Sequence, residues 1–195
     1  MKKLIFSFVL LVFLSSAAMA QVQFGLKAGA MWSNTVLVEP DSLSGSYDAK
    51  ISYLLGGFMT IPISSKFNVQ PEVFYASKGD QYTNRHYINL PVMLQYQVIN
   101  KLKVEVGPEI GYMLAAYSKF PGSEARSRWD IEDFDIGINV GASYAILDRW
   151  IIGLRYNMGI YNTHGYRSFV AGSGLPDYNI QNRTLQLSVG WKLGK

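Results

Sequence analysis

The sequence contains no cysteine among its 195 residues. This absence excludes a disulfide framework, thiolate zinc and iron–sulfur sites, a cysteine nucleophile and a lipid-modified N-terminal cysteine. Charged residues are also scarce, at 16% against roughly 25% in ordinary soluble domains. Histidine occurs only twice, and two separated histidines with scattered acids lack the spacing of a metal site. We therefore expect no cofactor and no bound metal.

The first twenty residues follow the pattern of a secretory signal peptide. Two lysines form a basic start, an apolar run covers 4–14, and residues 18–20 (Ala-Met-Ala) are a small-x-small cleavage site. The apolar run is too short for a membrane span; a retained N-terminal anchor is the alternative. Cleavage before Gln21 removes two lysines and lowers the formal net charge from +4 to +2. Because no basic run remains, we expect no nucleic-acid partner.

Long hydrophobic runs are missing from residues 21–195, which we expect to form one domain. No stretch there is apolar for eighteen residues, so no transmembrane helix is predicted. Apolar and polar residues instead alternate with period two, which is typical of strands with one apolar face. Eight such runs occur, at 22–32, 51–63, 67–75, 88–98, 102–114, 134–146, 150–158 and 185–193.

The connections between these runs alternate strictly between short and long. The short connections are 64–66, 99–101 and 147–149, and the long segments are 33–50, 79–86, 117–132 and 162–182. Alternation gathers the short turns at one end of the sheet and the long segments at the other, as in outer-membrane barrels. Runs of about 10–14 residues can cross a bilayer with tilt. The sequence therefore predicts an all-β fold, an eight-stranded antiparallel up-and-down transmembrane β-barrel.

Aromatic residues concentrate toward both ends of the apolar faces. Amphipathic rings prefer membrane interfaces, so this placement predicts two girdles. Their expected members are Trp32, Tyr53, Tyr75 and Tyr112 near the long segments, and Tyr96, Tyr144, Trp150 and Trp191 near the short turns. A soluble eight-stranded ligand-binding barrel is the alternative fold and would turn these rings inward, but the sorted connections favour the membrane barrel.

The other face of each strand is small, polar or charged, and we expect it to line the lumen, because a charge at mid-bilayer depth costs about 2–4 kcal/mol. Eight strands enclose a space just wide enough for side chains, in which charges need partners. We therefore hypothesise an ion-pair network that closes the lumen. Its expected members are Lys27, Glu72, Glu105, Glu109, Asp135 and Arg155. Lys103 and Lys192, near strand ends, are expected at the watery rim.

Two long segments are rich in tyrosine, glycine and arginine, which is typical of recognition loops. The candidate recognition residues are Tyr117, Arg126, Arg128 and Trp129 in one segment, and Tyr166, Arg167, Phe169 and Tyr178 in the other. Alternatively, these segments only cover the barrel mouth or contact lipopolysaccharide phosphates.

Enzymatic activity is the chemically most specific of the functional alternatives. His86 and His164 lie at the long-segment end, and Ser168, Ser173 and Asp177 follow His164 in the same segment. A nucleophile–base pair there would suit a lipid A-modifying enzyme. No spaced nucleophile motif accompanies these residues, so we expect no enzymatic activity.

A passage for small hydrophobic molecules is the third alternative. Leu54, Phe58 and Phe74 fall on inward positions by parity, where they line or plug an apolar pocket. A bulge near Gly56 and Gly57 would instead turn the strand's register outward.

Four strand motifs resemble a known family. They are YINLPVMLQY at 87–96, VGPEIGYML at 106–114, FDIGINVGA at 134–142 and LRYNMGI at 154–160. Together they resemble the PorT-like outer membrane β-barrel family, which is similar in architecture to the small OmpA/OmpX-type barrels. Gln95 stands where that family usually has lysine, and its usual C-terminal aromatic is missing from the end of the chain.

The resemblance implies a small integral outer membrane protein of a Gram-negative-type bacterium. The expected role is structural or surface recognition, with a secretion-associated role in some members. The expected partners are outer membrane lipid and lipopolysaccharide, the barrel-assembly machinery during insertion, and an unidentified extracellular or envelope protein.

Overall fold

A computed structural model describes residues 22–38, 43–46, 49–79, 83–118, 134–160 and 179–194. Within these ranges no helix is long and apolar enough to cross a membrane. The described residues form the strands β1 (Gln23–Val38), β2 (Leu43–Ser46), β3 (Lys50–Pro62), β4 (Phe67–Gly79), β5 (Thr83–Ile99), β6 (Leu102–Ser118), β7 (Phe134–Ala145), β8 (Trp150–Gly159) and β9 (Asn179–Leu193).

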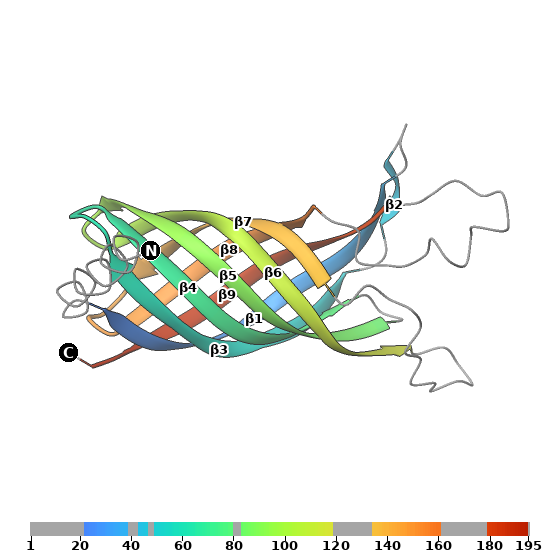
Figure 1. Ribbon diagram of the computed structural model, residues 1–195, viewed down its shortest axis with the longest axis horizontal. Helices are drawn as coiled ribbons and strands as arrows, with labels where there is room; N and C mark the ends of the chain where they lie inside the picture. Colours follow the sequence, from blue (N-terminus) through green and yellow to red (C-terminus); the bar gives the residue numbers. More distant parts are fainter. Residues whose placement is uncertain are drawn as a thin grey trace, which may run out of the picture.

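Eight of these strands form a closed antiparallel barrel, which confirms the predicted fold class (Figure 1). Each strand from β3 to β9 pairs with its neighbour in the chain, β1 pairs with β3, and β1 closes the barrel by pairing with β9. The short connections between β3 and β4, β5 and β6, and β7 and β8 all lie at one end (Figure 1). Strand β2 lies outside the barrel wall and pairs only with the end of β1.

Several strands extend further toward the long segments than the alternation predicted. β1 continues to Val38, β4 reaches Gly79, β5 already begins at Thr83, and β9 begins at Asn179. The predicted segments 33–50, 79–86 and 162–182 are therefore partly strand, and those boundaries were wrong. Backbone hydrogen bonds between paired strands continue beyond the part of the barrel that faces lipid. Side chains there no longer need to alternate between apolar and polar, so the sequence pattern ends before the strand does.

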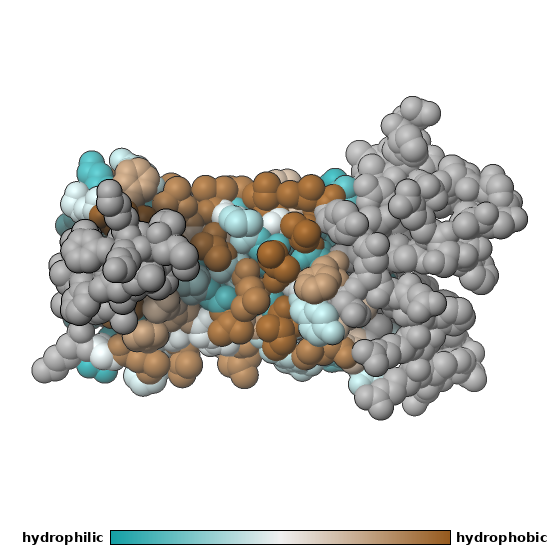
Figure 2. Space-filling view, in the orientation of Figure 1, coloured by the Kyte–Doolittle hydropathy of each residue, from teal (hydrophilic) through white to brown (hydrophobic). Residues whose placement is uncertain are grey.

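The outer surface of the barrel carries the apolar faces of the strands. Figure 2 shows hydrophobic residues gathered over the middle of the barrel. Seven predicted girdle residues are exposed on the outside: Trp32, Tyr53, Tyr96, Tyr112, Tyr144, Trp150 and Trp191. The eighth, Tyr75, is half-buried because its ring contacts Tyr53 and His86. At the short-turn end the rings of Trp150 and Trp191 lie 6.4 Å apart.

The register of β3 decides which of its residues enter the lumen. Its pairing with β1 and with β4 runs without a shift through Gly56 and Gly57. The bulge considered at this site is therefore absent from β3. Leu54 and Phe58 keep their inward positions and are buried.

Candidate functional site

The lumen is the most constrained chemical environment in the described part of the chain. Alternation along three strands turns four acids inward: Glu72 of β4, Glu105 and Glu109 of β6, and Asp135 of β7. Lys27 of β1 and Arg155 of β8 are also inward, and all six predicted network residues are buried. These charges share a narrow space away from bulk water. Their pairing therefore determines whether the lumen is closed or open.

Arg155 forms the centre of a first cluster, nearer the short turns. Its Nη1 and Nη2 donate to the two carboxylate oxygens of Glu72 at 3.0 and 2.9 Å, and its Nε and Nη2 donate to Glu105 Oε1 at 3.0 and 2.8 Å. Lys27 Nζ lies 2.9 Å from Glu72 Oε2. This fork geometry is the strong, bidentate form of the arginine–carboxylate bond.

Glutamine amides complete the first cluster. Gln70 Nε2 donates to Glu72 Oε1 at 2.8 Å, and Gln95 Nε2 donates to Glu105 Oε2 at 2.9 Å. Every carboxylate oxygen of Glu72 and Glu105 therefore accepts a hydrogen bond. Gln95 stands where the PorT-like pattern has a lysine. It donates a neutral hydrogen bond to Glu105, whereas a lysine would donate a charged one.

Lys78 organises a second cluster, toward the long segments. Its Nζ lies 2.9 Å from Glu109 Oε1 and 3.3 Å from Asp135 Oδ2, and 5.4 Å from the centre of the Tyr87 ring. Asn139 Nδ2 donates to Glu109 Oε2 at 2.9 Å. The six predicted residues thus divide between two clusters, four around Arg155 and two around Lys78.

Lys78 is a network residue that the sequence does not predict. The apolar alternation predicts this strand only over 67–75 and predicts a connection at 79–86. Inward positions 70, 72, 74 and 76 of β4 are buried, and the same parity reaches Lys78. Extending the alternation of β4 by a few residues would have placed Lys78 in the lumen. Glu109 and Asp135, which had no assigned basic partner, pointed to such a residue.

We expect Lys78→Met to lower the free energy of unfolding by about 1.5–3 kcal/mol, because Glu109 and Asp135 lose their charged donor. The loss stays moderate because Lys78 supplies only two hydrogen bonds, and Glu109 and Asp135 each keep an amide donor, from Asn139 and Asn182. Urea titration of the detergent-folded protein, followed by heat-dependent gel mobility, measures the change. The control is Lys66→Met in the exposed β3–β4 turn; equal stability of the two variants would contradict this role for Lys78.

The apolar part of the lumen is filled by side chains of β1, β3 and β4. Met31, Leu54, Phe74 and Ala76 form a buried cluster. The Phe58 ring occupies the space beside Gly25, where a Cβ would lie 2.1 Å from Phe58 Cζ. In the described residues Leu54 and Phe74 therefore fill the lumen, and the Phe58 ring lines a cavity at its short-turn end.

Five of the lumen residues keep buried polar atoms without a hydrogen-bond partner among the described residues. These atoms are both amide atoms of Asn89 and of Gln186, Ser52 Oγ, Arg85 Nη1 and the Tyr87 hydroxyl. Buried groups of this kind normally bind ordered water. The lumen is therefore packed but retains polar positions that water can satisfy.

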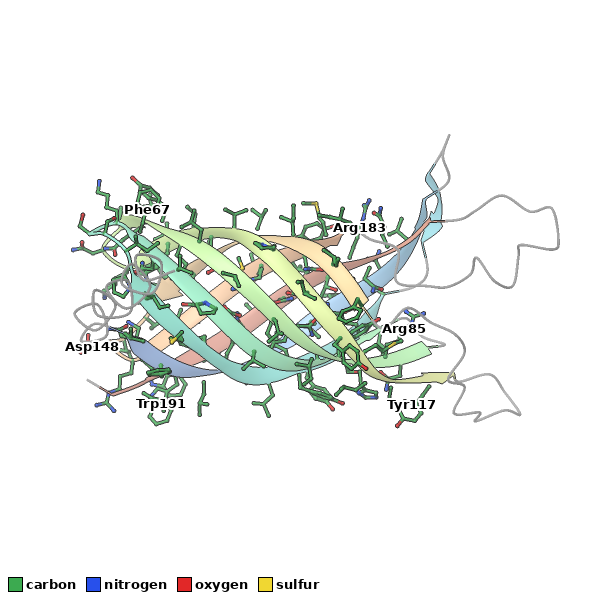
Figure 3. All side chains as sticks on the ribbon, in the orientation of Figure 1. Phe67, Arg85, Tyr117, Asp148, Arg183 and Trp191 are labelled. Atoms are coloured by element: carbon green, nitrogen blue, oxygen red, sulfur yellow. The ribbon has the colours of Figure 1, made fainter. Side chains whose placement is uncertain are left out.

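His86 lies on the outer surface of β5 and not in a connection, which corrects its predicted place. Its ring stacks on the Tyr75 ring with 5.7 Å between the ring centres, and it packs edge-on against the Tyr117 ring with 5.4 Å between the centres. Its Nδ1 is hydrogen-bonded to the Tyr75 hydroxyl. Figure 3 shows Tyr117 at the end opposite Phe67 and Trp191. Tyr117, the one candidate recognition residue in a described strand, is exposed there.

The other candidate recognition residues lie outside the described residues: Arg126, Arg128, Trp129, Tyr166, Arg167, Phe169 and Tyr178. The same holds for His164, Ser168, Ser173 and Asp177 of the enzymatic alternative. The described ranges contain no group of three or more histidine and acidic residues arranged to hold a metal ion.

Solved structures similar to this chain are small outer membrane barrels. Neisserial surface protein A is 13% identical with a TM-score of 0.53, over 87% of this chain and 97% of that one. The attachment invasion locus protein Ail of Yersinia pestis is 12% identical with a TM-score of 0.48, over 88% and 98%. The first likeness shows the fold alone. A search of curated protein sequences gave no significant match.

A sequence match to a family model assigns the chain to a family, which the structural likeness does not. The model described as "Outer membrane protein beta-barrel domain" matches residues 15–165, which is more than half of the chain. The narrower PorT-like assignment stays a prediction. The closed eight-stranded barrel, its apolar outer surface and this match agree, and the chain belongs to the outer membrane protein β-barrel domain family.

Proposed function

We propose that this protein is a non-conducting, non-enzymatic outer membrane anchor that presents its long segments to an extracellular or envelope partner. The observation that carries the proposal is the bridge from Arg155 to Glu72. These residues belong to β8 and β4, which are four strands apart in either direction around the barrel. Their side chains meet across its axis, and Lys27 and Glu105 join them from β1 and β6.

The filled lumen disfavours the transport alternative. A channel needs a continuous path, whereas Arg155, Glu72 and the packed Leu54 and Phe74 occupy the middle of this barrel. Passage of a small hydrophobic molecule would require these groups to move together. Charged groups paired in a low-dielectric space resist such movement, because separating them exposes an unpaired buried charge.

Presentation of the long segments is supported by how the strands continue past the barrel wall. β1 extends beyond its pairing with β3, carries β2 on its edge, and remains paired with β9 as far as Val38. Tyr117 and His86 form an aromatic contact at the same end. The segments that contain the candidate recognition residues start from these strand ends, and we include a secretion-associated partner among those they would contact.

Single-channel recording tests the closed lumen. We expect the folded protein in a planar lipid bilayer to show no stable open state of nanosiemens size, because the ion-pair bridge blocks the axis. A triple variant, Glu72→Ala, Glu105→Ala and Arg155→Ala, is the matched control, since it shortens the blocking side chains in the same barrel. We expect stable or flickering openings from it. A steady nanosiemens pore in the unmodified protein would overturn the proposal.

A further inference from the structure

The mouth of the barrel at the short-turn end is hollow and strongly basic. A cavity of about 50 Å³ opens there, which is room for on the order of four water molecules or one small anion. This is the end that Phe67, Asp148 and Trp191 mark in Figure 3. Its charged lining consists of Lys27, Lys101, Lys103, Arg155 and Lys192, with Glu105 as the sole acid among them.

The deeper charges of this lining are already satisfied. Arg155 uses Nε, Nη1 and Nη2 on Glu72 and Glu105, and Lys27 pairs with Glu72. These two bases and two acids balance. The surplus positive charge of the cavity therefore comes from the three remaining lysines, nearer the opening.

Lys101, Lys103 and Lys192 form no ion pair with a carboxylate in the described part of the chain. Lys103 Nζ donates only to the neutral Gln95 Oε1, at 3.3 Å. Lys103 and Lys192 are also near enough to repel each other electrostatically, and Glu105 is the acid that attracts Lys103. Three like charges around a cavity whose single acid is already hydrogen-bonded favour a bound anion.

The uncharged lining suits the same ligand. Ser143 contributes a hydroxyl group to the cavity wall, whereas the Ser188 hydroxyl donates to the Gly153 carbonyl oxygen at 3.4 Å. Phe58, Ala145 and Ile151 form the apolar part of the wall. Both oxygens of Glu105 are occupied by Arg155 and Gln95, so its charge is largely neutralised. The lysine ammonium groups are therefore the donors that remain for a ligand.

We propose that this mouth is a binding site for a phosphate-class anion, held by the Lys101, Lys103 and Lys192 ammonium groups. The ammonium groups supply charge-assisted hydrogen bonds to the phosphate oxygens. Short turns of such barrels face the periplasm, so the phosphate is either a free anion from that compartment or the headgroup of a lipid in the adjacent leaflet. The site is independent of the proposed anchoring role, because it requires no function of the long segments.

Two binding measurements on the full-length folded protein distinguish these sources. In phosphatidylcholine nanodiscs, inorganic phosphate is titrated and binding is followed by ³¹P line broadening. In parallel, native mass spectrometry compares retention of phosphatidylglycerol with that of phosphatidylcholine. Saturable phosphate binding, or selective retention of phosphatidylglycerol, supports the site and names its source. Absence of both overturns the proposal.

A pair of double variants locates the binding. Lys103→Gln with Lys192→Gln removes two charges from the cavity, whereas Lys66→Gln with Arg149→Gln removes two exposed charges from the same end of the barrel outside it. We expect the first to weaken anion binding about tenfold and the second to change it less than about twofold, because screened surface charges contribute little. Equal losses in both variants would show a diffuse surface potential and overturn the site. Heat-dependent gel mobility verifies that both variants fold.

Discussion

An Arg155→Met variant is expected to lose about 3–5 kcal/mol of unfolding free energy, the largest effect of any single substitution in the ion-pair clusters. Removing one partner of a buried pair leaves the other charge without compensation. Here two carboxylates, Glu72 and Glu105, would lose four hydrogen bonds from one guanidinium. Lys27 would remain paired with Glu72, which leaves Glu105 with the neutral amide of Gln95 as its hydrogen-bond donor.

Urea titration in detergent micelles measures this loss, with heat-dependent gel mobility reporting the folded fraction. Arg149→Met is the control, because Arg149 is exposed in the β7–β8 turn, and we expect its effect to stay within about 0.5 kcal/mol. A loss at Arg155 no larger than at Arg149 would show that the bridge contributes nothing to stability.

A further variant separates the unpaired charge from the lost packing. Combining Arg155→Met with Glu72→Gln and Glu105→Gln removes the uncompensated acids while keeping the side-chain volumes. Since buried ion pairs are often replaced by neutral groups with little loss, we expect this triple variant to be more stable than Arg155→Met alone. If it is less stable, then packing around the guanidinium, and not charge compensation, accounts for the effect.

Parity along the strands was sufficient to predict which residues enter the lumen. The period of two is fixed by strand geometry, and the cost of a charge facing lipid leaves only one orientation for residues such as Glu109 and Arg155. The barrel itself was predicted from the alternation of short and long connections. Parity predicts no distances between side chains, because it orders residues along one strand and does not give the stagger between strands.

Partner choice in the lumen could not be predicted for that reason. Arg155 reaches Glu72 across the barrel axis, and Lys78 reaches Asp135 three strands away around the wall. These contacts depend on how far each strand is shifted relative to its neighbours. Lys78 was missed for a related reason: the polar ends of β4 and β5 lack the apolar alternation that marks a strand within the lipid.

Gly56 provides the second large effect, and its cause lies in the backbone. A Cβ at this position would lie 2.1 Å from the Val73 carbonyl oxygen and 2.5 Å from Phe74 Cα on the paired strand β4. A flexible side chain could move aside, but these atoms belong to the sheet itself. The curvature of β3 against β4 therefore depends on a residue without a side chain at this inward position.

We expect Gly56→Ala to lower the unfolding free energy by about 3 kcal/mol or more, the upper end of the range for overpacking, because β4 must shift to admit the methyl group. Gly57→Ala is the matched control one residue along, where a Cβ meets only the Gly25 carbonyl oxygen, at 3.3 Å. We expect that change to stay within about 1 kcal/mol, helped by the lower entropy of the unfolded chain. Urea titration of both variants measures the difference: equal stability would mean that β3 relaxes freely around Gly56.

Because β4 carries Glu72, a shift of this strand would also loosen the bridge to Arg155. Gly56→Ala combined with Arg155→Met should therefore lose less than the sum of the two single losses.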